Sequence, residues 1–330
     1  MKVTSSIRSS PIVRWTLMLA VLALPQMGMA QWQATAGAQN GSKAMQSLAF
    51  FPNEIWIHAG DSITWTVASD EPHTISFLIS GQPRPPFAVG CPGTTPNNSI
   101  FDGTHCVNTG FLGVGQSYTV FFPATGNFKL VCLIHTNMTG TIHVLDPWQS
   151  LPHDRDFYDD QASKQRADLL SDYDRSRKNH SRDHDQKEPN KVTAGTGEST
   201  ASPGGAKTLS VMRFMQPNKV VHVGETVEWE NADPVTAHTI TFGVEPANPI
   251  PPSSNVTLDA DGARHATISS PSDSVHSGFI VAAPQDRIGL SQSPLPVTRF
   301  RVTFTSAGIF PYKCALHDTL GMTGQITVLP

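Results

Sequence analysis

Short segments in which apolar and polar residues alternate run through most of the chain, and they occur in two similar sets. Residues 44–67 alternate over two segments separated by Gly60-Asp61, and residues 220–229 repeat the second half of this pattern. Trp65 and Trp229 hold matching positions, where we expect core side chains. Alternation interrupted by turn residues is typical of β-strands. The pattern predicts an all-β chain with two antiparallel Greek-key β-sandwiches.

The composition changes between the two sets. Residues 154–173 place apolar side chains at helical spacing behind an acidic start, which predicts an amphipathic helix docked on a sandwich or at the domain junction. Residues 179–207 are charged and then rich in Gly, Ser and Thr, so we expect a flexible linker. Residues 31–43 are small and polar and are expected to form a flexible arm. The expected organisation is a signal peptide (1–30), a first domain (31–146), a helix with a disordered linker (147–207) and a second domain (208–330).

The first thirty residues resemble a secretory signal. Lys2, Arg8 and Arg14 precede an apolar run that is too short to span a membrane, and Gly28-Met-Ala30 offers small residues for cleavage. We therefore expect a chain exported to the periplasm or beyond, with no membrane span in its mature form. Removing three basic and no acidic residues changes the formal net charge from −4 to −7. That balance disfavours nucleic acid as a partner and favours basic proteins.

The chemistry lies in two similar loops that each offer a thiolate, an imidazole and a thioether. Soft Cu(I) prefers sulfur and Cu(II) accepts imidazole, so two His, one Cys and a distant Met suit a type 1 copper centre that keeps its geometry in both oxidation states. Each loop has a further histidine upstream, in the similar contexts Pro-His-Thr-Ile and Ala-His-Thr-Ile. The candidate ligand sets are His73, Cys132, His135 and Met138 in the first copy, and His238, Cys314, His317 and Met322 in the second.

The four cysteines allow more than one arrangement. Cys91 and Cys106 flank a Gly/Pro/Asn-rich loop and are expected to form a disulfide in an oxidising compartment. A second disulfide between Cys132 and Cys314 would leave the repeated His and Met spacings unexplained. A zinc site of Cys and His ligands is a further alternative, against which the Met residues count.

With both ligand sets located, the chain resembles the blue copper (cupredoxin) family twice, over about residues 44–146 and 208–330. The loop Cys-x-x-His-x-x-Met is similar to that of amicyanin, and Cys-x-x-His-x-x-x-x-Met has plastocyanin spacing. The resemblance implies two type 1 copper ions, with the cysteines as thiolate ligands, the methionines as weak axial ligands and the upstream histidines buried. It also implies that His135 and His317 lie on exposed loops where electrons enter and leave. Many members have Asn after the upstream His, where this chain has Thr74 and Thr239.

The function expected from this resemblance is single-electron transfer between redox proteins, with a cytochrome-like partner conceivable because the chain is acidic. Copper storage or delivery is an alternative, as is a domain that has lost redox use and serves to bind a partner. Copper nitrite reductases and multicopper oxidases carry a His directly before the type 1 Cys, and the oxidases also use His-x-His pairs. Val131 and Lys313 stand before the cysteines here, and no His-x-His occurs. We therefore expect an electron carrier and not an enzyme.

Overall fold

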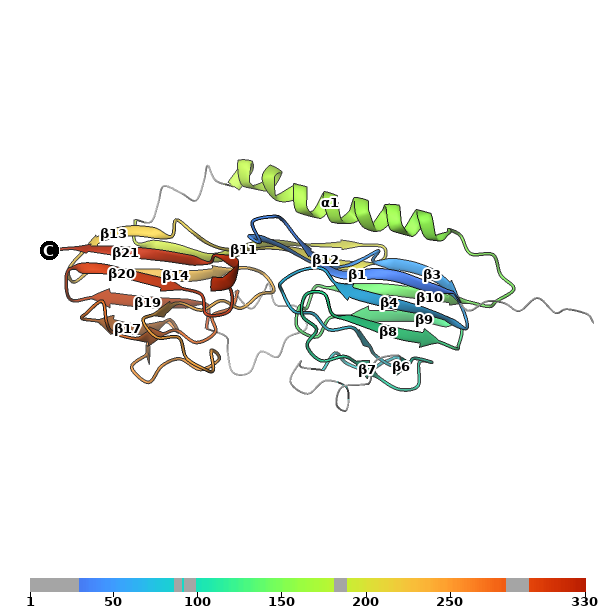
Figure 1. The fold of residues 1–330 in the computed structure, drawn as a ribbon. Helices are drawn as coiled ribbons and strands as arrows, with labels where there is room; N and C mark the ends of the chain where they lie inside the picture. The colour runs from blue at the N-terminus through green and yellow to red at the C-terminus, as the bar shows by residue number, and fades with distance from the viewer. Residues whose placement is uncertain (1–29, 86–90, 92–98, 181–188, 283–296) are drawn as a thin grey trace, which may run out of the picture.

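The computed structural model describes residues 30–85, 91, 99–180, 189–282 and 297–330 (Figure 1). The expected signal sequence lies outside the described residues except for Ala30. Strands are the main regular structure of the described chain, which also has one long helix, and this confirms the all-β prediction. None of its helices is long and apolar enough to cross a bilayer.

One sheet of eleven strands runs through both halves of the molecule. Its order is β16 (Thr257–Leu258), β17 (Arg264–Ile268), β19 (Arg299–Phe304), β14 (Thr226–Ala232), β11 (Lys191–Ser202), β12 (Gly205–Met215), β2 (Met45–Phe51), β1 (Gln31–Gln39), β4 (Asp61–Val67), β8 (Ser117–Phe122) and β6 (Ser99–Ile100). Strands β12 and β2 pair antiparallel at its centre, with Thr208 opposite Leu48 and Val211 opposite Met45. The two halves are thus joined by backbone hydrogen bonds, and we call this β2–β12 pair the seam.

Each half of the long sheet faces a sheet of five strands. The N-terminal one has the order β3 (Glu54–His58), β10 (Thr139–Leu145), β9 (Gly126–Val131), β5 (Ser76–Phe77) and β7 (Val107–Asn108). The C-terminal one has the order β13 (Asn218–His222), β21 (Thr323–Leu329), β20 (Gly308–Lys313), β15 (Thr241–Phe242) and β18 (Val275–His276). We call the resulting layers the N-terminal sandwich (β1–β10) and the C-terminal sandwich (β11–β21).

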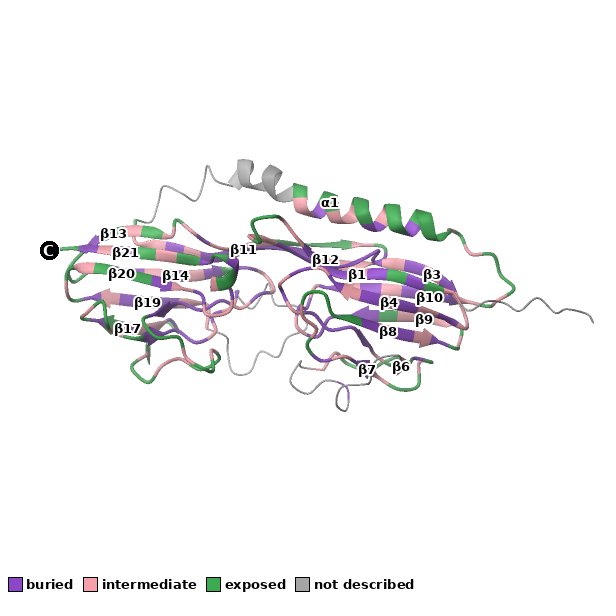
Figure 2. Cartoon of the chain, in the orientation of Figure 1, coloured by how far each residue is buried: buried purple, intermediate pink, exposed green. Residues whose placement is uncertain are grey.

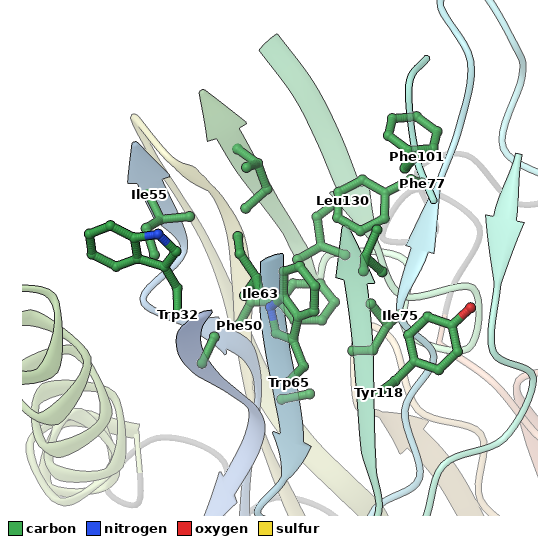
Figure 3. Close-up of a cluster of buried hydrophobic side chains, with 14 of the residues drawn as sticks. Trp32, Phe50, Ile55, Ile63, Trp65, Ile75, Phe77, Phe101, Tyr118 and Leu130 are labelled. Atoms are coloured by element: carbon green, nitrogen blue, oxygen red, sulfur yellow. The ribbon is translucent and has the colours of Figure 1, made fainter. Parts of the chain in front are cut away.

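A separate apolar core fills each sandwich. Trp65 is 1 % exposed and contacts Phe77 of the facing sheet, with ring centroids 5.6 Å apart (Figure 3). Trp229 is fully buried and contacts Phe242 in the same way, at 5.8 Å. Both tryptophans are therefore core residues, as the sequence pattern predicts. Complete burial of such side chains contributes roughly 1.5–3 kcal/mol each to folding. The matched tryptophans therefore stabilise the two sandwiches in the same way.

Helix α1 (Arg155–His180) lies across the seam (Figure 1). It starts where Asp154 accepts a hydrogen bond from the Phe157 amide, as an N-cap does. Ala162 and Leu169 face Phe51 of β2 and Leu209 of β12 in a small apolar cluster, while much of the helix's outer side is exposed (Figure 2). The predicted helix is present, and it covers the junction between the two halves.

Two stretches that the composition predicts to be flexible are strands instead. Gln31–Gln39, expected as an arm, is β1, and most of 191–207, expected as linker, forms β11 and the start of β12. Their small residues hide an alternation in which Ala34, Ala36, Val192 and Ala194 face the cores. Pairing with neighbours on both sides, rather than intrinsic propensity, stabilises these strands. Of the expected linker, residues 181–188 lie outside the described residues.

Candidate metal centres

A tight loop at the end of β9 presents Cys132 and His135 on the same side. The Cys132 amide donates to the Met138 carbonyl (3.0 Å), and the Met138 amide donates to the His135 carbonyl (3.3 Å). These bonds close the loop and place Met138 in the core, where it is fully buried. Residues at this spacing can therefore face one point from a single turn of chain.

The loop after β20 repeats the arrangement with two more residues. The Cys314 amide again donates to the Met322 carbonyl at 3.0 Å. A 3-10 helix, η2 (Asp318–Leu320), takes up the extra length, and Gly321 ends it in the left-handed region at φ 93°. Met322 is fully buried like its counterpart. The different loop lengths thus give the same closure.

The upstream histidines stand just before β5 and β15, the strands that pair with β9 and β20 in the same five-stranded sheets. His73 exchanges two backbone hydrogen bonds with Leu112, and His238 does the same with Ile280. Both histidines are fully buried. Each histidine therefore lies beside the strand that leads into its cysteine loop, so strand pairing within one sheet determines the spacing of the two histidines.

In each sandwich the two histidines and the cysteine converge. The Nδ1 atoms of His73 and His135 are 3.2 Å apart, and Sγ of Cys132 lies 3.7 Å from Nδ1 of His135. In the second site the two Nδ1 atoms are 3.1 Å apart, and Sγ of Cys314 lies 3.3 Å from Nδ1 of His317. In each group, all potential ligand atoms lie within 4.8 Å of one another. Two imidazole nitrogens and a sulfur converging in a buried space form a donor set that fits a soft or borderline metal ion.

The two threonines that follow the upstream histidines connect the ligand segments. The Thr74 hydroxyl accepts a hydrogen bond from the Leu133 amide (2.7 Å), and its own amide points to Sγ of Cys132 (3.4 Å). Thr239 repeats both contacts, with the Ala315 amide (2.8 Å) and with Sγ of Cys314 (3.3 Å). A threonine hydroxyl therefore holds the two segments together in this chain.

Comparison with known proteins agrees with this geometry. Residues 36–145 match the family model of copper binding proteins of the plastocyanin/azurin family.

Residues 36–145 are a cupredoxin domain.

No curated protein matches the chain significantly. Among solved structures, oxidised plastocyanin from Dryopteris crassirhizoma is 17 % identical, covering 42 % of this chain and 99 % of its own, with a TM-score of 0.23. An oxidised point mutant of amicyanin is 15 % identical, covering 35 % of this chain and 82 % of its own, with a TM-score of 0.25.

The disulfide predicted beside the first cupredoxin site is present. Cys91 and Cys106 are joined, and Cys132 and Cys314 are free and buried. The alternative in which Cys132 pairs with Cys314 is therefore wrong. Both sulfurs remain available to the sites in which they lie.

The exposed position expected for His135 and His317 is wrong. They are 2 % and 3 % exposed, because the loops that carry them face each other and not solvent. Between them lies Glu71, with Oε2 3.5 Å from Nε2 of His135 and Oε1 3.1 Å from Nε2 of His317. The resemblance to single-domain cupredoxins could not predict this, because the second sandwich covers the edge that such a protein leaves free.

The charges within each site support one another. Burial alone would raise the pKa of Cys132, but contacts with His135 and His73 hold it well below its usual range. Burial would lower the pKa of His135, yet Cys132 and Glu71 raise it to about 9. In the second site the neighbouring charges likewise outweigh burial: His317 and His238 lower the pKa of Cys314, and Cys314 and Glu71 raise the pKa of His317. The chain thus stabilises an anionic sulfur that requires positive charge beside it, and a bound metal ion supplies such charge.

The two sites differ in what backs the upstream histidine. Nε2 of His73 is 2.9 Å from the Ser69 hydroxyl, whereas Nε2 of His238 is 3.6 Å from Oδ2 of Asp233. Asp233 and His238 are both fully buried. The first site has a cation instead, because the Arg84 guanidinium donates to the carbonyl oxygens of Cys132 and Thr136. The two sites are therefore electrostatically unequal. The first has a neutral hydroxyl and a nearby cation, whereas the second has a carboxylate.

Sequence reasoning missed two glycines that shape the sites. Gly37 of β1 and Gly195 of β11 have φ of 74° and 70° and lie where the strand register shifts. A Cβ at Gly37 would collide with Nε2 of His73, and one at Gly195 with the His238 ring. The signal was present, because Thr-Ala-Gly occurs at both 35–37 and 193–195. Glu71, by contrast, has no acidic counterpart two residues before His238, where Thr236 stands.

Proposed function

We propose that this chain is an exported electron-transfer protein with two tandem cupredoxin domains, each holding one type 1 copper. The two buried His-Cys-His groups carry the proposal, since each offers the donor atoms that such a centre uses. A copper ion held there cycles between Cu(I) and Cu(II) and so accepts and releases single electrons. The domains correspond to the N-terminal and C-terminal sandwiches, with the second beginning at β11.

The proposed ligands are the eight residues predicted from the loops. His73, Cys132, His135 and Met138 would hold the first ion, and His238, Cys314, His317 and Met322 the second. The closed loops fix each cysteine and second histidine, and the threonine ties fix the upstream histidine against them. Ligands held this firmly need little rearrangement when the charge of the ion changes, which favours rapid electron transfer.

Burial of both groups favours this function over copper storage or delivery. All six His and Cys side chains are at most 3 % exposed, and metal exchange with a partner requires accessible ligands. Catalysis at a further copper is disfavoured by the sequence, which has no His beside either cysteine and no His-x-His. The partners are then a redox donor and a redox acceptor, with a basic cytochrome-like protein favoured by the acidic balance of the chain.

The test is copper content with visible and EPR spectra of the mature protein, alongside Cys132→Ser and Cys314→Ser. We expect two coppers, an intense thiolate-to-copper band, and loss of one site in each variant. A matched control is Cys106→Ser, which opens the disulfide and leaves both sulfur ligands in place. Colourless protein, or copper content unchanged by both ligand substitutions, would reject two type 1 sites and favour a zinc or copper-handling role.

A further inference from the structure

Glu71 is a buried carboxylate that contacts residues of both sandwiches. It is 5 % exposed and lies in the loop after β4, two residues before His73. Burying a carboxylate costs several kcal/mol unless it is paired. Its partners are His135 of its own sandwich and His317 of the other. A purely local role would need only one of them.

Several contacts hold the loop that carries Glu71. The Ser69 hydroxyl donates to the Glu71 carbonyl (3.2 Å) and contacts Nε2 of His73. Asp70 forms an ion pair with Lys43 (2.7 Å), and its amide donates to Gln39 of β1 (2.9 Å). The carboxylate is therefore fixed from the β1–β2 side, next to the seam, and is not a side chain free to swing between partners.

The position of the Glu71 carboxylate determines which nitrogen of the His135 and His317 rings is free to bind a metal ion. A carboxylate oxygen beside Nε2 favours the tautomer with its proton on that nitrogen, which leaves Nδ1 as the free donor. In both rings Nδ1 is the atom that faces the cysteine and the upstream histidine. One acidic side chain thus orients a ring in each site.

We propose that Glu71 bridges the two sites, fixing His135 and His317 in the ligating tautomer and providing the connection through which one electron passes between the domains. This rests on the proposed function, since it takes one copper in each site. With a copper ion in each site, the electron given up by one Cu(I) would be taken up by the Cu(II) of the other site, and no bond or proton would need to change. The path from His135 through Glu71 to His317 is short and buried. It crosses only two non-covalent contacts, of 3.5 Å and 3.1 Å.

The experiment compares Glu71→Gln and Glu71→Ala in the full chain with Glu54→Gln. Glu54 is the matched control, because it also pairs with a histidine, His143, at 2.9 Å, but on β3 and β10 away from both loops. Reduction potentials of both sites are measured, together with the rate at which an electron delivered by pulse radiolysis equilibrates between them. Glu71→Gln removes negative charge beside both rings, so both potentials should rise. Glu71→Ala should also slow equilibration roughly tenfold or more, the scale of effect for groups that orient metal ligands.

A second measurement does not depend on copper. In the apo protein, ¹⁵N NMR should show a slowly exchanging Nε2–H proton in both His135 and His317, because the Glu71 carboxylate holds it, and Glu71→Ala should lose this slow exchange for both rings while Glu54→Gln keeps it. Unchanged potentials, a shift at one site only, unchanged equilibration, or NMR signals unaffected by Glu71→Ala would each overturn the bridge. Wild-type protein that takes up no copper would instead reject the proposed function, and the NMR comparison would still decide whether Glu71 orients both rings.

Discussion

Gly37 and Gly195 show how a single missing side chain shapes a metal site. Each lies in a left-handed backbone conformation at a break in strand register, directly against the ring of an upstream histidine. Glycine adopts this conformation without the steric cost that a Cβ brings. Each position therefore needs glycine for two separate reasons. The backbone is left-handed, and the histidine ring leaves no space for a Cβ.

Gly37→Ala separates these requirements when it is compared with Gly115→Ala. Gly115 has a similar φ of 79° but open space around it. The left-handed backbone should cost about 1–2 kcal/mol in both variants. The collision with His73 should add about 1–3 kcal/mol only at Gly37. Chemical denaturation gives the stabilities, and EPR should show a changed spectrum of the first site in Gly37→Ala alone; equal behaviour of the two variants would contradict the contact with His73.

Asp233 provides a residue-scale test of the inequality between the sites. Asp233→Asn keeps an oxygen for the Ser210 hydroxyl and the Val235 and Thr236 amides, which contact Oδ1. It removes a buried negative charge beside His238, a charge that favours the more positive oxidation state by roughly 1 kcal/mol or more. The reduction potential of the second site should rise and that of the first should stay. Ser69→Ala is the matched change at His73 and removes no charge, so it should move the first potential by less than Asp233→Asn moves the second.

Helix α1 stabilises the seam as an element rather than through one contact. Its buried side touches β1, β2 and β12, and the Tyr158 hydroxyl accepts from the Trp56 amide of β3 at 3.1 Å. Its Gln165 also contacts Asn53 through two hydrogen bonds. The helix therefore bridges both halves of the long sheet where they meet.

Leu169→Ala tests this role of the helix. Leu169 is 4 % exposed within the cluster that includes Phe51 and Leu209. Loss of a buried leucine side chain typically costs about 2–5 kcal/mol. Lys164→Ala, on the exposed side of the same helix, should change the unfolding free energy by no more than about 0.5 kcal/mol. Urea denaturation followed by tryptophan fluorescence measures both, and equal effects would mean that the helix is not packed on the seam.

The elements also show where sequence patterns stop being informative. The loops with Cys, His and Met could be predicted because their spacing is local, and the strands with Trp65 and Trp229 because large apolar residues alternate there. Strands β1 and β11 could not be predicted from their small residues, since their stability comes from partners distant in the chain. Glu71 was not predicted as a site residue because its role depends on how the two sandwiches face each other.

At the scale of the whole molecule, the sheet through both halves changes the meaning of the repeat. The composition between the copies predicts a flexible connection, and the family resemblance implies that each second histidine lies on an exposed loop. The seam instead fixes one sandwich against the other and buries His135 and His317 at the junction. Relative placement of this kind arises from packing between repeats and is not encoded in either repeat alone.

The charge network at the outer side of the C-terminal sandwich predicts a pH dependence of stability. Hydrogen bonding to Arg301 and the nearby charge of Arg299 hold the pKa of Asp261 at about 2, against an ordinary 3.8. Since the folded pKa is depressed, this stabilisation is present above about pH 4 and is lost as the pH falls towards 2. Asp261→Asn should flatten the loss of stability between pH 5 and 2, as measured by urea midpoints. The exposed Asp160 of α1 offers the control, and a curve for Asp261→Asn parallel to that of Asp160→Asn would contradict the assignment.

The continuity of the sheet can be measured by native-state hydrogen exchange. Seam residues Gln46, Ser47, Thr208 and Ser210 are fully buried, and the Met212 amide donates to the Ala44 carbonyl at 2.8 Å. If the seam is part of one cooperative structure, its amides exchange only on global unfolding and match the protection of β4 and β14. The edge strands β6 and β16, which are largely exposed, serve as the fast-exchanging reference. Seam amides that exchange like these edges while β4 and β14 stay protected would show two loosely docked domains, and the fixed spacing that the Glu71 bridge needs would be absent.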